Sequence, residues 1–187
     1  MKHLGTQTME TPRLILRPFV MADARAMYEN WASDPEVTKY VTWPAHSSVE
    51  VTRMVLRDWT DSYENPDRYN WAIICRGGDG KPIGNISAVH VNEKTSEVEI
   101  GYCMGRAWWG RGIMTEALKA VIDYFIEQVG ANRVAARYDT NNPGSGRVMA
   151  KAGMTYEGTL RQAARNNQGI VDVGCYSILA EDWRRNQ

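Results

Sequence analysis

The sequence predicts a single domain of mixed α/β class, and three observations support that prediction. The chain has 187 residues, of which 43% are hydrophobic, and this size and composition suit one globular domain. Runs rich in β-branched and aromatic residues alternate with segments of helical spacing. One long helical segment separates two strand-like runs, and such a crossover places its two strands side by side and parallel. We therefore expect a mixed, mostly antiparallel sheet with one parallel pair and flanking helices.

The first half of the chain is expected to hold a strand, helices and then three antiparallel strands. Residues 1–10 are polar and are predicted to form a flexible arm, which leaves 11–187 as the domain. Ser47-Ser-Val-Glu50 has the pattern of a capping box at a helix start, and Asn65-Pro66 ends that helix. The predicted segments are a strand over 13–17, helical segments over 23–31, 34–36 and 47–63, and strands over 69–76, 83–91 and 97–104.

The second half is expected to supply the crossover and a final hairpin. Apolar residues recur at helical spacing over 113–129, and Gly130 provides a stop. The other predicted segments are a strand over 133–138, a short helix over 146–152, and paired strands over 155–165 and 170–179. The turn that opens helix 113–129 should then lie at the carboxyl ends of the parallel strands, where open α/β sheets bind ligands.

That turn, Gly110-Arg111-Gly112, is a candidate anion site. A helix start exposes unpaired backbone N–H groups at the positive end of the helix dipole, and this geometry binds phosphates above all. The alternative is that the two glycines only permit a tight turn. A dinucleotide fingerprint needs a third glycine where Thr115 stands, and no Walker A pattern is present.

The composition argues against several classes of function. Basic and acidic residues number 22 each. The chain therefore lacks the surplus of positive charge that is typical of nucleic-acid-binding proteins. No apolar stretch has the length of a membrane span, and the first residues lack the apolar core of a signal peptide. Cys75, Cys103 and Cys175 stand far apart with no histidine nearby, which argues against a metal site and fits reduced thiols in a cytoplasmic protein.

Four stretches of the chain, in this order and at this spacing, resemble the GNAT superfamily of acetyl-CoA-dependent N-acetyltransferases. They are Thr11-Pro-Arg-Leu-Ile-Leu-Arg17, Glu99-Ile-Gly-Tyr102 followed by Trp109-Gly-Arg-Gly-Ile-Met-Thr-Glu116, Asn142-Pro-Gly-Ser-Gly-Arg147, and Lys151-Ala-Gly-Met154. Within the superfamily they are most similar to the RimJ/RimL-type branch of ribosomal-protein-serine and -alanine acetyltransferases. The resemblance covers nearly the whole chain and implies the GNAT fold, in which the central parallel strands splay apart.

The resemblance also implies that the glycine-rich turn holds coenzyme A, and no metal is expected beside it. In the family the backbone amides of this turn bind the pyrophosphate, and the strand before it offers free backbone groups to the pantetheine arm. The residues so implied are Tyr102, Cys103, Met104, Trp109, Gly110, Arg111, Gly112, Ile113, Met114, Thr115, Asn142 and Ser145. Trp109 and Met114 depart from the family consensus, and Met114 is expected to leave less room near the phosphate than glycine would.

Ser145 and Glu99 are the candidate catalytic residues. Met149 stands where many family members carry a tyrosine acid, so the RimL-like alternative implies that Ser145 hydrogen-bonds the coenzyme sulfur. The competing interpretation of Ser145 is a helix N-cap. Strand alternation places Glu99 mid-strand beside the implied thioester, where a carboxylate can act as a base if its face borders a cleft. The competing interpretation of Glu99 is a cross-strand salt bridge.

The acceptor is expected to be an amine, either a protein N-terminus or a small molecule, with no nucleic acid or membrane as partner. Its pocket should come from the N-terminal helices, loop 43–46 and the C-terminal hairpin, with Tyr40, Trp43 and His46 as lining residues. The alternative is that these aromatic residues only pack helices onto the sheet. A non-catalytic acyl-CoA-binding module on the same fold is the alternative function. Seven tryptophans and nine tyrosines also favour a homodimer.

Overall fold

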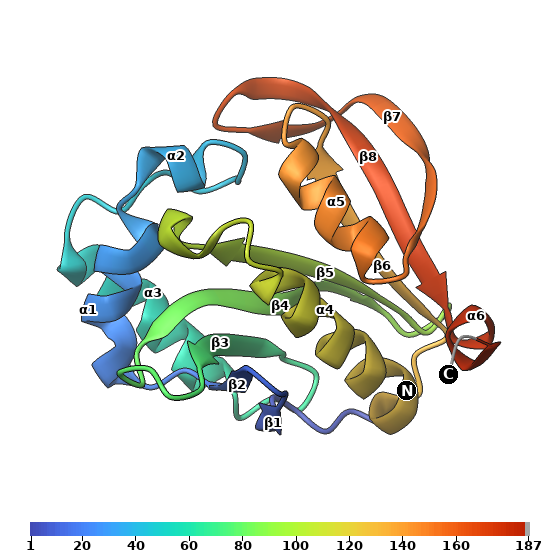
Figure 1. The fold of residues 1–187 in the computed structure, drawn as a ribbon, viewed down its shortest axis with the longest axis horizontal. Helices are drawn as coiled ribbons and strands as arrows, with labels where there is room; N and C mark the ends of the chain where they lie inside the picture. Colours follow the sequence, from blue (N-terminus) through green and yellow to red (C-terminus); the bar gives the residue numbers. More distant parts are fainter. Residues whose placement is uncertain (186–187) are drawn as a thin grey trace.

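Eight strands form one twisted sheet in the computed structural model, which describes residues 1–185 of the chain (Figure 1). The strands lie in the order β1-β2-β3-β4-β5-β6-β8-β7, and only β5 and β6 pair in parallel. Their bounds are β1 Met9–Glu10, β2 Leu14–Pro18, β3 Asn70–Cys75, β4 Pro82–Asn92, β5 Glu97–Met104, β6 Arg133–Asp139, β7 Thr155–Asn166 and β8 Gly169–Leu179. The predicted mixed sheet with one parallel pair is confirmed.

Helices cover both faces of this sheet (Figure 1). One face carries η1 (Met21–Asp23), α1 (Ala24–Met27), the π-helical turn η2 (Tyr28–Ala32), α2 (Pro35–Thr38) and α3 (Val49–Ser62). The other carries η3 (Arg106–Trp108), α4 (Ile113–Asp123), its π-helical continuation η4 (Tyr124–Val129), α5 (Pro143–Lys151) and α6 (Ala180–Arg185). The helix predicted over 113–129 is therefore confirmed at both ends, with Gly130 in the left-handed conformation that closes it.

Alternation along the strands produces the two hydrophobic cores. In β3, Trp71 and Ile73 pack on the side of α4, whereas Ala72 and Ile74 pack on the side of α1 and α3. A strand that is buried on both faces reads as a continuous apolar run, which is what residues 71–74 show.

The parallel pair stays together for only half of its length. Backbone partners run from Glu97 and Arg133 to Ile100 and Ala136. Beyond that point β5 remains paired with β4 as far as Met104, while β6 follows β8. The predicted splay is thus confirmed, and it leaves one edge of each strand without a partner strand.

Three local expectations need correction. The cap of α3 is Ser48, whose hydroxyl accepts the Val51 N–H at 3.4 Å, so the capping box drawn from Ser47 to Glu50 is wrong by one residue. The helix expected over 146–152 begins earlier, at Pro143, because proline suits the first helical position. Helix α6 was not expected, and Trp183 anchors it by donating its indole N–H to Asp123 at 2.7 Å.

Residues 1–10 lie against the domain. The Lys2 N–H donates to the Val129 carbonyl at 2.8 Å, the Trp71 indole donates to the Gln7 carbonyl at 2.7 Å, and Met9 pairs with Leu16. The division into a flexible arm and a domain that begins at residue 11 stays a prediction.

A polar network joins four strands at the end where β5 and β6 are paired. Arg133 donates from Nε to Glu97 at 2.6 Å and from its two terminal nitrogens to Glu157 at 2.6 and 2.5 Å. Ser177 also donates to Glu157, at 2.8 Å. These bonds, those from Arg133 first, lower the pKa of Glu157 from its ordinary value of 4.5 to about 2.

We predict that Glu157→Gln lowers the melting temperature at neutral pH by about 3 °C. A carboxyl with a depressed pKa stabilises the fold above its unfolded-state pKa, and that stabilisation is lost as pH falls through its folded-state value. The difference between wild type and variant should therefore shrink between about pH 5 and pH 2. Glu181→Gln, at a largely exposed helix pair, is the matched control. A difference that persists unchanged at pH 2 would contradict the role of the network.

Candidate functional site

The start of α4 presents a row of backbone donors with nothing to bind inside the protein. Gly110 and Gly112 have φ of 74° and 72°, a left-handed conformation that glycine adopts without strain. Gly112 is the N-cap residue of α4, and because it has no side chain it cannot cap the helix. Within the described residues, the N–H groups of 111–115 have no hydrogen-bond acceptor. An uncapped helix start with free N–H groups is a site for an anion.

Arg13, the residue just before β2, braces this turn, a role that the sequence analysis missed. Its Nη1 donates to the Arg111 carbonyl at 2.9 Å, and its Nε donates to Glu116 at 2.5 Å. Glu116 also accepts the Thr11 hydroxyl at 2.6 Å and the Arg13 N–H at 2.9 Å. Burial opposes the charge on Glu116, but these hydrogen bonds outweigh it and hold the pKa of the carboxyl below its ordinary value. The turn is thereby fixed before any ligand arrives.

The side chains around the turn leave its outer surface open. Met114 and Ile113 are buried in the core, so the expectation that Met114 crowds the anion site is wrong. Trp109 is half exposed, and its indole N–H donates to the Met104 carbonyl at 2.7 Å, which ties the turn to the end of β5. A β-carbon built on Gly110 meets nothing within 4 Å.

Tyr102 and Ser145 link the unpaired part of β5 to the first turn of α5. The Tyr102 hydroxyl donates to the Ser145 carbonyl at 2.9 Å, and the Ser145 hydroxyl donates to the Tyr102 oxygen at 3.0 Å. Burial raises the pKa of Tyr102, so its phenol stays protonated at neutral pH. The N-cap interpretation of Ser145 is wrong, because Asn142 is the cap residue of α5 and makes no side-chain cap bond there.

Tyr138 holds α5 against β8 from the other parted strand. A β-carbon on Gly146 would come within 2.8 Å of the Tyr138 ring, and one on Gly174 within 2.2 Å. Only glycine at both positions leaves room for the ring, so the first turn of α5 sits close against β6. Tyr102 and Tyr138 each stand two residues beyond the last paired residues of their strands.

Glu99 lies one residue before the strands part, and its carboxylate is 3.5 Å from Arg137 Nε. The side chain of Glu99 is 18% exposed. The cross-strand ion pair that was the alternative to a catalytic role for Glu99 is therefore present. It holds the carboxylate near the point where β5 and β6 separate. Cys103, further along β5, is no competing nucleophile, because burial raises the pKa of its thiol to about 12.

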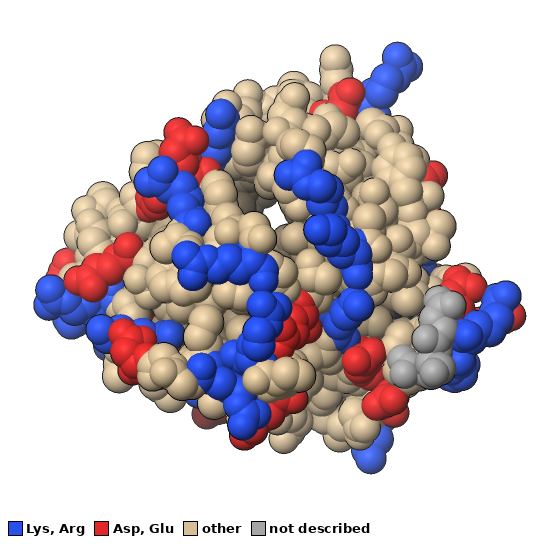
Figure 2. Space-filling model, viewed as in Figure 1, with Lys and Arg blue, Asp and Glu red and all other residues tan. Residues whose placement is uncertain are grey.

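Basic residues surround the mouth of the gap on the α4 and α5 side. Figure 2 shows an opening beside α5, on the side that faces α2, with Lys and Arg side chains on both flanks. Arg111 at the turn before α4 is exposed, as are Arg147 and Lys151 on α5. A polyanion that approaches the α4 turn therefore meets a favourable electrostatic field.

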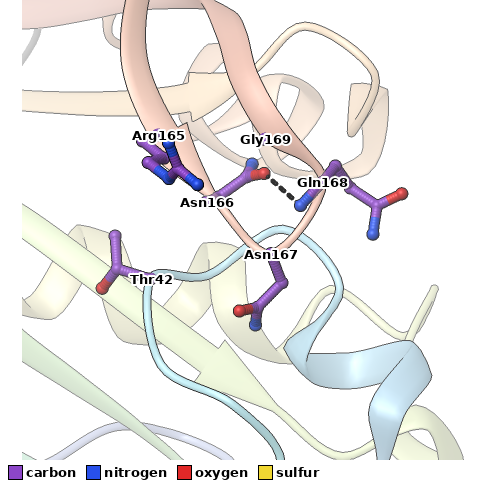
Figure 3. Close-up of a pocket in the computed structure, with 6 residues that line it drawn as sticks. All are labelled: Thr42, Arg165, Asn166, Asn167, Gln168 and Gly169. Atoms are coloured by element: carbon purple, nitrogen blue, oxygen red, sulfur yellow. Dashed lines mark hydrogen bonds between the residues drawn. The ribbon is translucent and has the colours of Figure 1, made fainter.

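A polar cavity of about 570 Å³, widely open to solvent, lies where the β7–β8 hairpin meets the loop after α2 (Figure 3). Its lining residues are Thr42, Arg165, Asn166, Asn167, Gln168 and Gly169. The expected meeting of the hairpin with this loop is thus observed, but Tyr40, Trp43 and His46 do not line the cavity.

The positions of these three residues explain the difference. His46 is buried, its Nδ1 lies 2.8 Å from the Thr52 hydroxyl, and burial lowers its pKa. Trp43 packs against His46 with ring centres 5.3 Å apart, and Tyr40 lies under the Lys39 ammonium. Their contacts favour the packing interpretation that competed with a lining role.

The described residues show neither a metal cluster nor a membrane span. Nowhere in residues 1–185 do three His, Cys, Asp or Glu side chains gather as ligands. No helix in that range is both long enough and apolar enough to cross a bilayer.

Comparison with known proteins matches residues 13–155 to the family of acetyltransferase (GNAT) domains. An uncharacterized N-acetyltransferase of Bacillus subtilis, YoaA, is 32% identical over 172 residues, covering 91% of this chain and 96% of its own. The ribosomal-protein-serine acetyltransferase of Escherichia coli is 32% identical over 99 residues, covering 53% of this chain and 55% of its own. Among solved structures, RimL, a ribosomal L7/L12 alpha-N-protein acetyltransferase in complex with coenzyme A, has a TM-score of 0.82 at 20% identity, covering 92% of this chain and 98% of its own, a likeness of fold.

Proposed function

This chain belongs to the GNAT acetyltransferase family, and we propose that it binds acetyl-CoA at the start of α4 and transfers the acetyl group to an amine in the gap between β5 and β6. The observation that carries the proposal is the set of free N–H groups at 111–115, placed beside two strands that part. Direct transfer with both substrates bound needs no covalent enzyme intermediate, and the raised pKa of the Cys103 thiol agrees with that.

The groups at the start of α4 and along β5 suit the diphosphate and the pantetheine arm of coenzyme A. Backbone N–H groups of Arg111 to Thr115 would bind the diphosphate, with the Arg111 side chain as a charge-assisted contact. The edge of β5 from Tyr102 to Met104 has no partner strand and would bind an extended pantetheine through main-chain hydrogen bonds. Asn142 and Ser145 stand at the start of α5, across the gap. Acetyl-CoA supplies the activated acetyl thioester.

As the carbon–sulfur bond of the thioester breaks, Ser145 would keep its proton and donate a hydrogen bond to the departing thiolate, which then takes a proton from solvent. The hydroxyl now points at Tyr102, and rotation about one side-chain bond redirects it. Tyr102 could then donate to the Ser145 oxygen instead of its carbonyl, so Tyr102 positions Ser145. A backbone N–H of Tyr102 or Cys103 would polarise the carbonyl, as in an oxyanion hole.

Glu99 would accept the proton of the amine, directly or through a water molecule. Glu99 and Tyr102 are three residues apart in β5, so their side chains lie on opposite faces of the sheet. Tyr102 packs against the core on the α4 side. The coenzyme would therefore enter from the α4 and α5 side, and the amine would arrive from the opposite face. An α-amine with an ordinary pKa near 8 needs only modest help at neutral pH.

We propose a protein N-terminus as the acceptor, because two of the compared proteins are named as ribosomal-protein acetyltransferases. A small-molecule amine is the alternative acceptor. The homodimer and the cytoplasmic location also stay proposals. A non-catalytic acyl-CoA-binding module remains the competing function, and binding without thiol release across a broad panel of amines would favour it.

Replacing Arg13 by alanine should raise KM for acetyl-CoA about tenfold while kcat changes by less than about twofold. The reason is that Arg13 orients the anion-binding turn without touching the reacting atoms. Steady-state thiol release measures both constants. Arg25→Ala is the matched control, because Arg25 forms an exposed ion pair with Glu29 on a different helix. Equal effects of the two variants would contradict the bracing role.

For Ser145→Ala we expect kcat to fall at least about tenfold with the dissociation constant of coenzyme A nearly unchanged. Tyr102→Phe should cause a smaller loss, since it removes only the group that positions Ser145. Thiol-release kinetics and calorimetric binding separate the two effects. Comparable losses of turnover and coenzyme affinity in Ser145→Ala would refute the leaving-group role.

A further inference from the structure

The cavity at the hairpin tip is bordered by contacts between the β7–β8 hairpin and the loop after α2. Asn167 donates its side-chain amide to the Thr38 carbonyl at 2.8 Å and to the Trp43 carbonyl at 2.7 Å. Its backbone N–H donates to the Val41 carbonyl at 3.2 Å. Figure 3 shows Thr42 on this loop facing the hairpin residues, with the Gln168 N–H bound to the Asn166 side chain. The cavity is thus framed by fixed backbone.

One positive charge in this cavity has no counter-charge in the protein. The lining groups are a hydroxyl, three side-chain amides and the Arg165 guanidinium, with no carboxylate among them. Arg165 is exposed and, like Arg111 and Arg147, makes no ion pair within the described chain. An unpaired guanidinium at an open polar pocket is free to bind a carboxylate through two parallel hydrogen bonds.

Two carboxylates on the strands that lead toward this cavity already have hydrogen-bond partners. Asp139 is buried and accepts hydrogen bonds from the Asn141 backbone and side chain and from the Asn166 side chain, at 2.9, 3.1 and 2.7 Å. Asp172 on β8 accepts the Gln162 N–H at 2.8 Å. These contacts draw each carboxylate to another partner, so the charge of Arg165 stays available to a ligand.

The same contacts place the cavity next to the reaction site. Asn166 is joined through Asp139 to Asn141, and the Asn142 N–H donates to the Asp139 carbonyl at 2.7 Å. Asn142 begins α5, on which Ser145 stands. A chain whose amine lies at the parted strands can therefore pass its next residues along the hairpin to Arg165.

We propose that the acceptor is the N-terminus of a peptide or protein with an acidic side chain among its first few residues, and that Arg165 binds this carboxylate. The inference deepens the proposed acetyl transfer and rests on it. The positive charge of Arg165 would repel polyamines and aminoglycosides, so these amines are disfavoured as acceptors. A peptide, rather than a free acidic amino acid, is the ligand whose length spans from the gap to the hairpin tip.

The test is thiol release by the full-length protein with acetyl-CoA and three hexapeptides that share an N-terminal serine. The peptides carry Glu, Gln or Lys at positions two to four, and spermidine and free glutamate complete the panel. We expect kcat/KM to fall from Glu to Gln to Lys, with about a tenfold span, which corresponds to about 1.4 kcal/mol. Arg165→Gln should flatten this order, Arg165→Glu should reverse it, and Arg165→Lys should keep it.

The control is Arg57→Glu, a charge reversal at an exposed position on α3 that should leave the peptide order unchanged. Transfer with no charge preference, or with a preference that survives Arg165→Glu, would overturn the acceptor assignment while leaving acetyl transfer intact. Stronger activity on free glutamate or spermidine than on every peptide would also overturn it. No thiol release with any amine in the panel would instead count against the proposed function itself.

Discussion

The separation of β5 from β6 is the constraint on which the rest of the structure depends. Each strand keeps a full antiparallel partner on its outer side, β4 for β5 and β8 for β6, so the sheet stays intact on either side of the gap. Their inner edges lose each other beyond Ile100 and Ala136. Unpaired main-chain groups are costly unless water or a ligand binds them, and an extended ligand can satisfy a strand edge directly. The gap is therefore a binding element that belongs to the sheet itself.

Two helix starts flank this gap, and each is fixed by residues from distant parts of the chain. The α4 turn is held by Arg13, which precedes β2, and the α5 turn is held by Tyr102 from β5. One start presents uncapped donors for an anion, and the other presents a serine hydroxyl. Rigid elements place these groups with little freedom, which is what catalysis by positioning requires. The acceptor side is different, because there two loops are joined by Asn167.

Local patterns predicted the elements of this fold better than they predicted side-chain partners. Helical spacing and two left-handed glycines define α4 and its continuation, and alternation gives the bounds of β5 without error. The role of Arg13 could not be predicted, because its partner Glu116 is 103 residues away in sequence. His46 was expected in a pocket, but its bond to Thr52 depends on tertiary packing. A binding role for Arg165 could not be predicted either, because only the folded structure shows that its guanidinium has no ion-pair partner.

The most direct test of the account is a crystal structure of the protein with coenzyme A. We predict that the diphosphate accepts hydrogen bonds from the backbone N–H groups of Arg111 to Thr115, and that the pantetheine arm runs along β5 toward Ser145. A coenzyme bound elsewhere, with the turn from Gly110 to Gly112 in contact only with solvent or side chains, would contradict it.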